Sequence, residues 1–221
     1  MENNQIVIEN LTKTYGKHRI LDGISFKASP GDFICIFGKS GSGKTTLLNI
    51  MGALEDYQEG KVVLFSKMNP IRNRKMSETI RRNDIAYLFQ DFALVDYLTV
   101  KENLKLALKY NKEVMNHESA MIDVLEKVQL KDKLDMKVFE LSGGEQQRIA
   151  LARNMLKPYD VLLADEPTGS LDQENREMVI RMLQELNQSG KTIIVVSHDP
   201  VFREVAHQSY YLQNGTLRPM S

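Results

Sequence analysis

Residues 33–46, FICIFGKSGSGKTT, restrict the fold more than any other part of the chain. Five apolar residues lead into a glycine-rich loop, and apolar residues at helical spacing follow it. The pattern G-x-x-x-x-G-K-[ST] occurs at Gly38, Gly43, Lys44 and Thr45, in the strand–loop–helix context that it requires. We therefore expect a buried strand, a loop that binds phosphate, and a helix that begins at the end of the loop.

Each residue type in this loop suits a bound phosphate. Glycines let backbone N–H groups close around phosphate oxygens with no Cβ in the way. The start of the following helix adds unpaired N–H groups and the positive end of the helix dipole. Lys44 would bring a point charge to the β- and γ-phosphates, and the Thr45 hydroxyl is a hard oxygen ligand for Mg²⁺. A glycine-rich turn with a solvent-facing lysine is the alternative, and it leaves the flanking pattern unexplained.

Length and composition fit one domain without a strong charge. The chain has 221 residues, with 29 basic and 29 acidic side chains, so no net charge attracts nucleic acid or an anionic membrane. Cys35 is the only cysteine, which excludes an internal disulfide and suits a buried thiol. The first residues lack a basic-then-apolar signal, and no apolar run approaches the roughly 20 residues that cross a bilayer. We expect a cytoplasmic protein that reaches the membrane through a partner.

Strand and helix patterns alternate at both ends of the chain, and the middle is mainly helical. Apolar, β-branched runs predict strands at residues 5–11, 20–26, 33–37, 61–65, 85–90, 161–165 and 192–196. Thr99 and Glu102 have the spacing of a capping box and predict a helix after them. We therefore expect an α/β core at residues 1–90 and 158–221, with a helical subdomain at residues 91–157.

A second glycine pair lies at residues 141–148, LSGGEQQR. Ser142 and Glu145 form another capping-box pattern, so a helix should begin there. Gly143 and Gly144 in its first turn would expose backbone N–H groups at the positive end of the helix, which predicts a second anion site. An ordinary capped helix would carry helix-forming residues at these two positions.

Polar residues end or directly follow three of the predicted strands, at Gln90, at Asp165 and Glu166, and at His198. The carboxyl ends of parallel strands meet at one edge of a sheet, where ligands bind. Asp165 suits a carboxylate linked to Mg²⁺, and Glu166, which would point differently along the extended backbone, suits a base for water. His198 is a candidate contact to the γ-phosphate. The alternatives are a surface Asp–Glu pair and a histidine with an ordinary structural role.

Together these motifs resemble the nucleotide-binding subunits of ABC transporters over essentially the whole chain. They follow the family's order, which is GKSGSGKTT at 38–46, Gln90, LSGGEQQR at 141–148, VLLADEPT at 161–168, SLD at 170–172 and His198. The phosphate loop alone indicates only a P-loop nucleotidase, and LSGGEQQR identifies the family. The resemblance implies one α/β domain, residues 1–221: a P-loop NTPase core of the RecA type with a parallel sheet, an N-terminal antiparallel β subdomain and an inserted α-helical subdomain.

The resemblance also implies the cofactors ATP and Mg²⁺ and a role for each matching residue. Tyr15 would stack on adenine, and Mg²⁺ would be held by Thr45, Gln90 and Asp165. Glu166 would polarise the attacking water, His198 would contact the γ-phosphate, and Gln90 would join them as a catalytic residue. The phosphate cradle would comprise Gly38, Lys39, Ser40, Gly41, Ser42, Gly43, Lys44, Thr45 and Thr46.

Ser142, Gly143 and Gly144 would complete the site of a second copy in a head-to-tail dimer closed by ATP. Two residues depart from the common family pattern. Lys39 stands where proline is frequent, and Glu145 stands where many members have glutamine. Neither change alters the spacing of the motifs.

Within the family, residues 87–104 and 164–172 look most like the macrolide-exporter and lipoprotein-release branch, especially Gram-positive bacteriocin or antimicrobial-peptide export ATPases. The partner would be a separate membrane permease, which would hold the protein at the inner face of the membrane. A lipoprotein-release or cell-division-type ATPase that transmits mechanical force is the alternative. The apolar run at residues 92–98 would either dock the permease or pack inside the helical subdomain.

Three other functions fit less well. A soluble ABC ATPase acting on DNA carries long coiled coils between the halves of its site, and the interval from Thr46 to Leu141 has no sustained heptads. A translation-associated ABC protein normally has two nucleotide domains, whereas this chain has one phosphate loop. A P-loop metabolite kinase would not need LSGGEQQR. We therefore expect no nucleic-acid partner.

Overall fold

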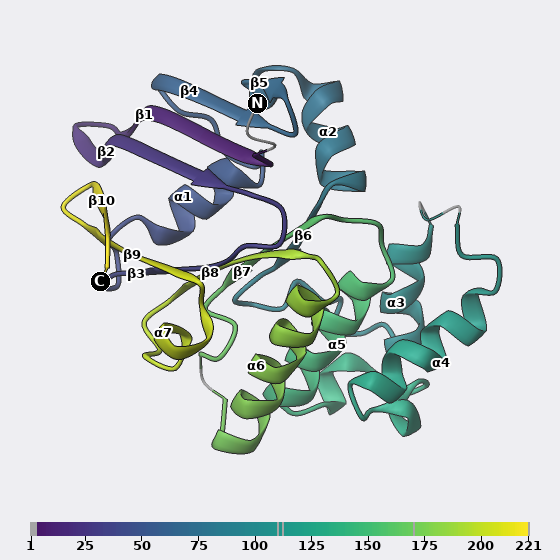
Figure 1. Ribbon diagram of the computed structural model, residues 1–221. Helices are drawn as coiled ribbons and strands as arrows, with labels where there is room; N and C mark the ends of the chain where they lie inside the picture. Colours follow the sequence, from purple (N-terminus) through teal and green to yellow (C-terminus); the bar gives the residue numbers. More distant parts are fainter. Residues whose placement is uncertain (1–3, 110, 112, 170, 221) are drawn as a thin grey trace.

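The computed structural model describes residues 4–109, 111, 113–169 and 171–220, which form two sheets and the helices around them (Figure 1). The strands are β1 (Ile6–Tyr15), β2 (His18–Ala28), β3 (Phe33–Phe37), β4 (Glu59–Leu64), β5 (Lys67–Met68), β6 (Ile85–Leu88), β7 (Val161–Asp165), β8 (Thr192–Ser197), β9 (Gln208–Gln213) and β10 (Thr216–Pro219). The helices are α1 (Lys44–Met51), α2 (Arg74–Asn83), α3 (Val100–Leu108), α4 (His117–Lys127), α5 (Gly143–Met155), α6 (Gln173–Gln188) and α7 (Phe202–Val205). Short 3-10 turns cover Pro70–Arg72, Lys131–Lys133 and Val138–Glu140.

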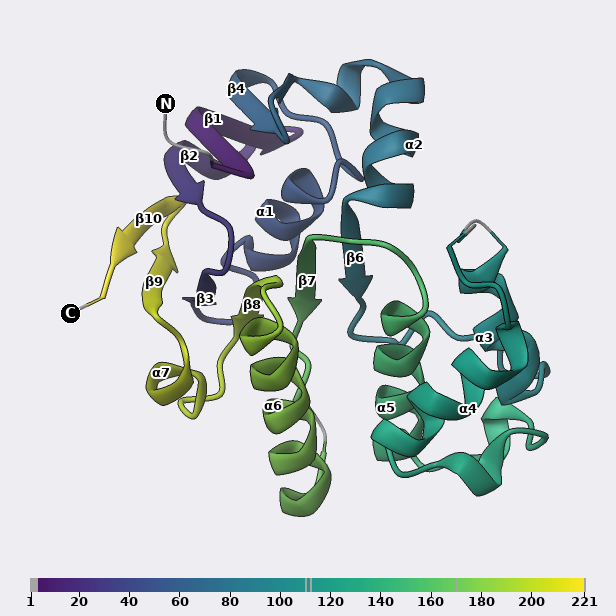
Figure 2. The same ribbon diagram turned by 45° about the vertical axis from the view of Figure 1, so that its right-hand side comes forward.

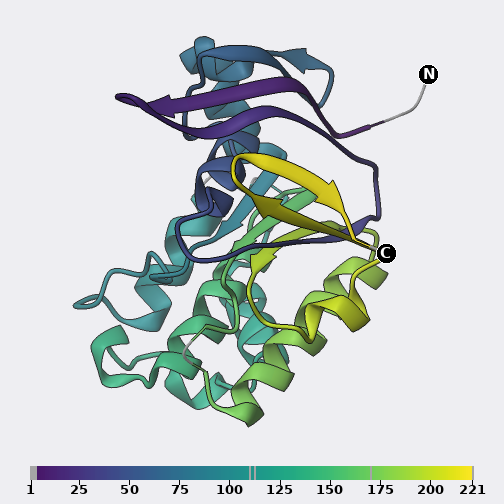
Figure 3. The same ribbon diagram turned by 90° about the vertical axis from the view of Figure 1, so that its left-hand side faces the viewer.

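The core sheet has the strand order β10-β9-β3-β8-β7-β6. β3 pairs in parallel with both β9 and β8, and β8-β7-β6 continue the parallel arrangement. The expected parallel sheet is therefore confirmed. One strand of the core sheet is not parallel, because β10 folds back antiparallel on β9. It forms one edge of the core sheet and lies below β1 and β2 in the view of Figure 3.

A second sheet, with the order β2-β1-β4-β5, is antiparallel and confirms the N-terminal β subdomain. Helix α1 lies between the two sheets, while α5 and α6 cover the opposite face of the core sheet (Figure 1). Because side chains alternate along a strand, each core strand contributes to two separate hydrophobic cores. Ile34 and Ile36 pack toward α1, whereas Phe33 and Cys35 pack toward the helices on the other face.

Cys35 is buried in this second core, as expected. Burial raises the pKa of its thiol, which keeps the side chain protonated and unreactive.

The inserted helical part is confirmed as well. Helices α3 and α4 lie at the outer side of the molecule, and α5 lies between them and α6 (Figure 2). Both predicted capping boxes form, at Thr99 with Glu102 and at Ser142 with Glu145. Across the described residues, the helices are too short or too polar to cross a membrane.

One strand ends earlier than expected. β6 stops at Leu88 rather than at Gln90, because the backbone turns there and Phe92 N donates to Phe89 O at 3.0 Å. Gln90 therefore lies on an exposed turn beyond the sheet, at the same edge as the ends of β7 and β8.

Candidate functional site

A pocket of about 720 Å³ opens at the carboxyl edge of the core sheet. It brings together most of the residues singled out from the sequence, which are Tyr15, Lys39, Ser40, Gly41, Gly43, Lys44, Thr45, Thr46, Gln90, Glu166 and His198. Ile20 and Gly169 complete the lining. Gly38, Ser42 and Asp165 belong to the same loop and strand end but do not line the pocket, and Ser142, Gly143 and Gly144 lie outside it.

The glycines of the loop are required by close packing. Gly43 has φ +99°, and a Cβ there would lie 2.7 Å from Ile20 Cγ2. A Cβ at Gly38 would lie 2.6 Å from the backbone oxygen of Leu212. The loop is therefore pressed between β2 and β9, and α1 begins at Lys44 with its first N–H groups at the pocket.

The Lys44 ammonium is held inside the loop. Its Nζ donates to Gly38 O at 2.8 Å and to Lys39 O at 3.3 Å, and the residue is only 8% exposed. Glu166 Oε1 lies 3.4 Å from the same Nζ and balances its charge. A buried cation with a single carboxylate partner is well placed to receive another anion.

Glu166 has an unusual backbone conformation. Its φ of +45° lies in the left-handed region, which costs energy for a residue with a side chain and is often found at functional sites. Its Oε2 accepts from Ser197 Oγ at 3.1 Å and from His198 N at 3.2 Å. His198 Nδ1 also lies 2.9 Å from Oε2, while most of the histidine ring faces solvent. The glutamate is thus aimed into the pocket by the end of β8.

Asp165 occupies a different environment from Glu166. It is 4% exposed and is hydrogen-bonded by Thr45, but its Oδ1 is buried and has no hydrogen-bond partner among the residues that the structure describes. Burial, and next the neighbouring charge of Glu166, raise the pKa of Asp165 despite the Thr45 bond. An orphaned carboxylate oxygen beside a threonine hydroxyl suits a hard cation such as Mg²⁺. Among the described residues, no three His, Cys, Asp or Glu side chains gather into a metal site by themselves.

We expect Asp165→Asn to stabilise the nucleotide-free protein. Because the folded pKa is raised, the folded state holds this proton at pH values where the unfolded chain has lost it, so stability falls as pH rises through that interval. Above the raised pKa the cost of the buried charge is fully present, and the neutral amide removes it. A gain of about 1 kcal/mol, or roughly 3 °C in Tm, should appear in thermal melts with EDTA and shrink toward pH 4. A variant that melts below the wild type at pH 7 would contradict this account.

The two glycines at the start of α5 differ in their surroundings. Gly144 is buried, and a Cβ there would lie 2.4 Å from the Asn175 side chain on α6. Gly143 is exposed, and a Cβ would meet nothing within 4 Å. Packing within the chain therefore explains why residue 144 is a glycine, but it gives no reason for a glycine at residue 143.

The structure adds a cluster that the sequence did not reveal. Asp199 accepts from Arg176 Nε at 2.7 Å and from Thr168 Oγ1 at 2.9 Å, and its N donates to Ser197 Oγ at 3.0 Å. Burial opposes ionisation, but the hydrogen bonds from Arg176 and Val201 N outweigh it and lower the pKa of Asp199. The cluster ties the turn that carries His198 to α6. Only the position of Asp199 next to His198 hinted at it, and Ser170 of the SLD motif lies outside the described residues.

A parallel sheet that leads through a glycine-rich loop into α1, with an acidic residue at the end of β7, defines a P-loop nucleotide-binding fold. The sequence profile of the ABC transporter family matches residues 21–169. The chain belongs to this family and is an ABC-type ATPase, as its sequence predicts.

Curated relatives place the chain near two kinds of exporter. It is 37% identical over 213 residues to the macrolide export ATP-binding/permease protein MacB of Campylobacter jejuni. This alignment covers 96% of this chain and 33% of MacB. It is 38% identical over 210 residues to the lipoprotein-releasing system ATP-binding protein LolD of Aquifex aeolicus. This alignment covers 95% of this chain and 94% of LolD. The chain thus spans about a third of the length of the MacB protein and nearly all of LolD.

Solved structures agree with the predicted fold class. The ABC transporter cassette MJ0796 of Methanocaldococcus jannaschii superposes with a TM-score of 0.90 at 34% identity, over 98% of both chains. That structure is dimeric, and a second one of the same cassette is a dimeric post-hydrolysis state bound to ADP and Pi.

Proposed function

We propose that this chain binds and hydrolyses ATP to power a separate membrane permease, and that the permease exports a bacteriocin or antimicrobial peptide or confers resistance to one. The observation that carries the enzymatic part is a pocket lined by the loop cation Lys44 and the oriented Glu166, with the buried Asp165 bonded to Thr45 just behind its lining. The match to a lipoprotein-releasing ATP-binding subunit over nearly its full length supports a separate permease. The protein would lie at the inner face of the membrane through that partner.

In this proposal the triphosphate lies along residues 38–46 and adenine stacks on Tyr15. The loop N–H groups and Lys44 bind the phosphate oxygens, and Thr46 continues the cradle into α1. Thr45, Gln90 and Asp165 would hold Mg²⁺, which when bound offsets the charge of the β- and γ-phosphate oxygens. The unpaired Oδ1 of Asp165 supports its place in this set.

Glu166 would act as the base that orients and polarises the attacking water, with His198 as the contact to the γ-phosphate. The Ser197 hydroxyl and the His198 N–H already fix Oε2, so Oε1, which pairs with Lys44 at 3.4 Å, is the oxygen that would accept a proton from water. Arrival of the γ-phosphate would draw the Lys44 ammonium from Glu166 toward the new anion. The Lys44–Glu166 ion pair would thereby give way to a free base beside the phosphate.

A second copy of the chain would complete each site. The start of α5 does not line the pocket of its own chain, and Gly143 has no packing reason to be glycine. Facing a nucleotide on another copy, Ser142, Gly143 and Gly144 would present a helix N-terminus to phosphate charge that one loop leaves exposed. The dimeric structures of the MJ0796 cassette, one of them bound to ADP and Pi, support the pairing of two copies.

Purification of the chain with its permease would test the transport role. We expect the reconstituted complex to hydrolyse Mg-ATP and candidate antimicrobial peptides to raise its turnover. Stimulation by lipoproteins instead would favour the lipoprotein-release alternative. A complex whose turnover responds to neither, while the chain alone binds DNA in an ATP-dependent way, would favour the DNA-associated class. The short lengths of α3 and α4, 9 and 11 residues, disfavour the coiled coils of that class.

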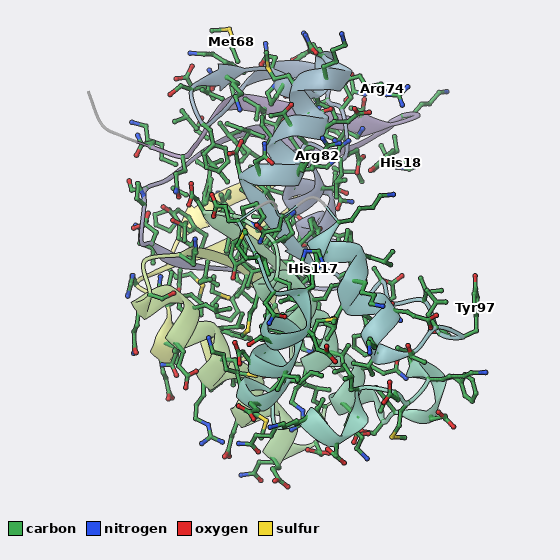
Figure 4. The ribbon with its side chains drawn as sticks, turned by 90° about the vertical axis from the view of Figure 1, so that its right-hand side faces the viewer. His18, Met68, Arg74, Arg82, Tyr97 and His117 are labelled. Carbon is green, nitrogen blue, oxygen red and sulfur yellow. The ribbon has the colours of Figure 1, made fainter. Side chains whose placement is uncertain are left out.

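The apolar run at residues 92–98 divides into two parts. Phe92 and Leu94 pack against the hydrophobic core, so packing within the chain explains them. Tyr97 is 74% exposed and projects from the edge of the helical part in Figure 4. A groove of about 200 Å³ is lined by Arg81, Arg153 and Lys157, and Arg153 donates to the backbone oxygen of Phe92 at the start of the run. The proposed docking surface is therefore Tyr97 with this groove, and not the whole run.

Tyr97→Asp should weaken copurification with the permease by at least about tenfold, because it places a charge at an exposed apolar anchor. Met115→Asp is the matched control, since Met115 is also an exposed apolar residue of the helical part, at 94%. Pull-down of the tagged chain, with ATP binding and Tm as checks on folding, would measure the effect. Equal recovery of permease by both variants would reject this docking surface.

A further inference from the structure

Lys13 is a buried charged residue that the proposed mechanism leaves without a role. Its side chain lies against that of Tyr15 at the end of β1, although the register of the strand shifts between Lys13 and Thr14. Its side chain is 9% exposed, and its Nζ lies 3.0 Å from Glu55 Oε1 and 2.6 Å from the backbone oxygen of Asp56. Charged side chains are buried in this way only when they are paired, so the Lys13–Glu55 pair is a built feature of the fold.

Glu55 holds Tyr15 as well. The Tyr15 hydroxyl donates to the same Oε1 that pairs with Lys13, and the Thr46 side chain is also hydrogen-bonded to this hydroxyl. Burial, followed by the bond to Glu55, raises the pKa of the tyrosine, which keeps the hydroxyl a donor. The hydroxyl end of the ring is thus fixed to two points, Glu55 after α1 and Thr46 in the first turn of α1.

The ring also has one face occupied. Lys13 Nζ lies over it, 4.8 Å from the ring centroid, where the negative face of an aromatic ring attracts a cation. Tyr15 remains 47% exposed and lines the pocket. A planar ligand can therefore stack only on the face that Lys13 does not cover.

Holding the ring in place has a consequence for affinity. A free tyrosine side chain loses rotamer freedom when a base stacks on it, and that loss opposes binding. A ring that is already fixed avoids this loss. We propose that Glu55, together with Lys13, is a positioning residue for the nucleoside base: it holds the Tyr15 ring beside the phosphate loop with one face open. This role depends on Tyr15 stacking on adenine, as proposed above.

Binding of ATP and of inorganic tripolyphosphate to the purified chain would test this role, because tripolyphosphate fills the phosphate loop but has no base. We expect Glu55→Ala to raise the dissociation constant for ATP about threefold to tenfold, leave that for tripolyphosphate unchanged, and leave kcat at saturating ATP unchanged. In a Tyr15→Ala background, which by itself weakens ATP about tenfold or more, Glu55→Ala should have no further effect. Equal weakening of both ligands would overturn the proposal, because Glu55 would then be a general support of the fold.

Two further variants keep the result interpretable. Glu9→Ala is the matched control, since Glu9 is likewise a glutamate paired with a lysine, Lys61 at 3.3 Å, but lies on β1 and does not line the pocket, and we expect unchanged ATP affinity. Tyr15→Phe keeps the ring and removes the bond to Glu55, so it should reproduce the Glu55→Ala effect even where Glu55→Ala fails to fold. If Tyr15→Ala weakens ATP but Tyr15→Phe and Glu55→Ala do not, positioning by Glu55 is wrong and stacking stands. If Tyr15→Ala has no effect, stacking itself is wrong.

Discussion

Glu166→Gln will bind ATP like the wild type but hydrolyse it at least about a hundredfold more slowly, the typical effect of losing a general base. The amide keeps the length of the side chain and can still accept from Ser197 Oγ and His198 N, so the site geometry should persist. It cannot take a proton from water. Because ATP is the proposed adhesive between two copies, the variant should also accumulate as a dimer in Mg-ATP.

Phosphate release measures the first effect, and light scattering after gel filtration with and without Mg-ATP measures the second. Glu118→Gln is the matched control, because Glu118 lies in the first turn of α4 and away from the pocket. It should retain wild-type turnover. Wild-type turnover in Glu166→Gln would show that Glu166 is not the general base. A variant that stays monomeric at saturating Mg-ATP would instead contradict the composite site formed by two copies.

Lys44→Ala will weaken ATP binding itself, by about tenfold to a hundredfold, which corresponds to the loss of one charge-assisted contact to phosphate. The Lys44 ammonium is buried and already pointed into the loop by Gly38 O and Lys39 O. Its charge is therefore poorly screened by solvent, and alanine leaves a phosphate oxygen without a partner. Titration of ATP by calorimetry measures the effect.

Lys39→Ala provides the comparison within the same loop. Lys39 lines the pocket but is exposed, so water and salt screen its charge and its loss should weaken ATP by a smaller factor, about threefold or less. Equal affinity of Lys44→Ala and the wild type would contradict the phosphate cradle. Equal losses in both variants would mean that overall charge, and not the geometry of the loop, governs binding.

Several parts of the fold could be predicted because their signals are local. The strand before residue 38, the loop and the start of α1 follow from a short run of apolar residues, glycines and Lys44. The capping boxes at Thr99 and Ser142 depend on contacts only three residues apart, and both form. The parallel core was predictable because its strands are continuous apolar runs, which are typical of strands buried on both faces.

Other features depend on contacts between distant segments. β10 is short and lacks an apolar run, and its antiparallel place at the edge follows from the turn after β9. The burial of Phe92 and Leu94 depends on helices far along the chain, so an apolar run alone could not separate packing from docking. The Arg176–Asp199 pair joins α6 to the end of β8 across 23 residues of sequence, and no local pattern marks it.

The amino-acid sequence by itself determined the class of protein and the residue types of its site, because a phosphate loop, a capped glycine helix and polar strand ends are short motifs with their own chemistry. Only the tertiary structure decided how these side chains are held. Glu55 lies 40 residues from Tyr15 and Ser197 lies 31 residues from Glu166, yet each pair shares a hydrogen bond. Such contacts form where separate strands and helices end side by side, and the packing of the two sheets around α1 sets those positions.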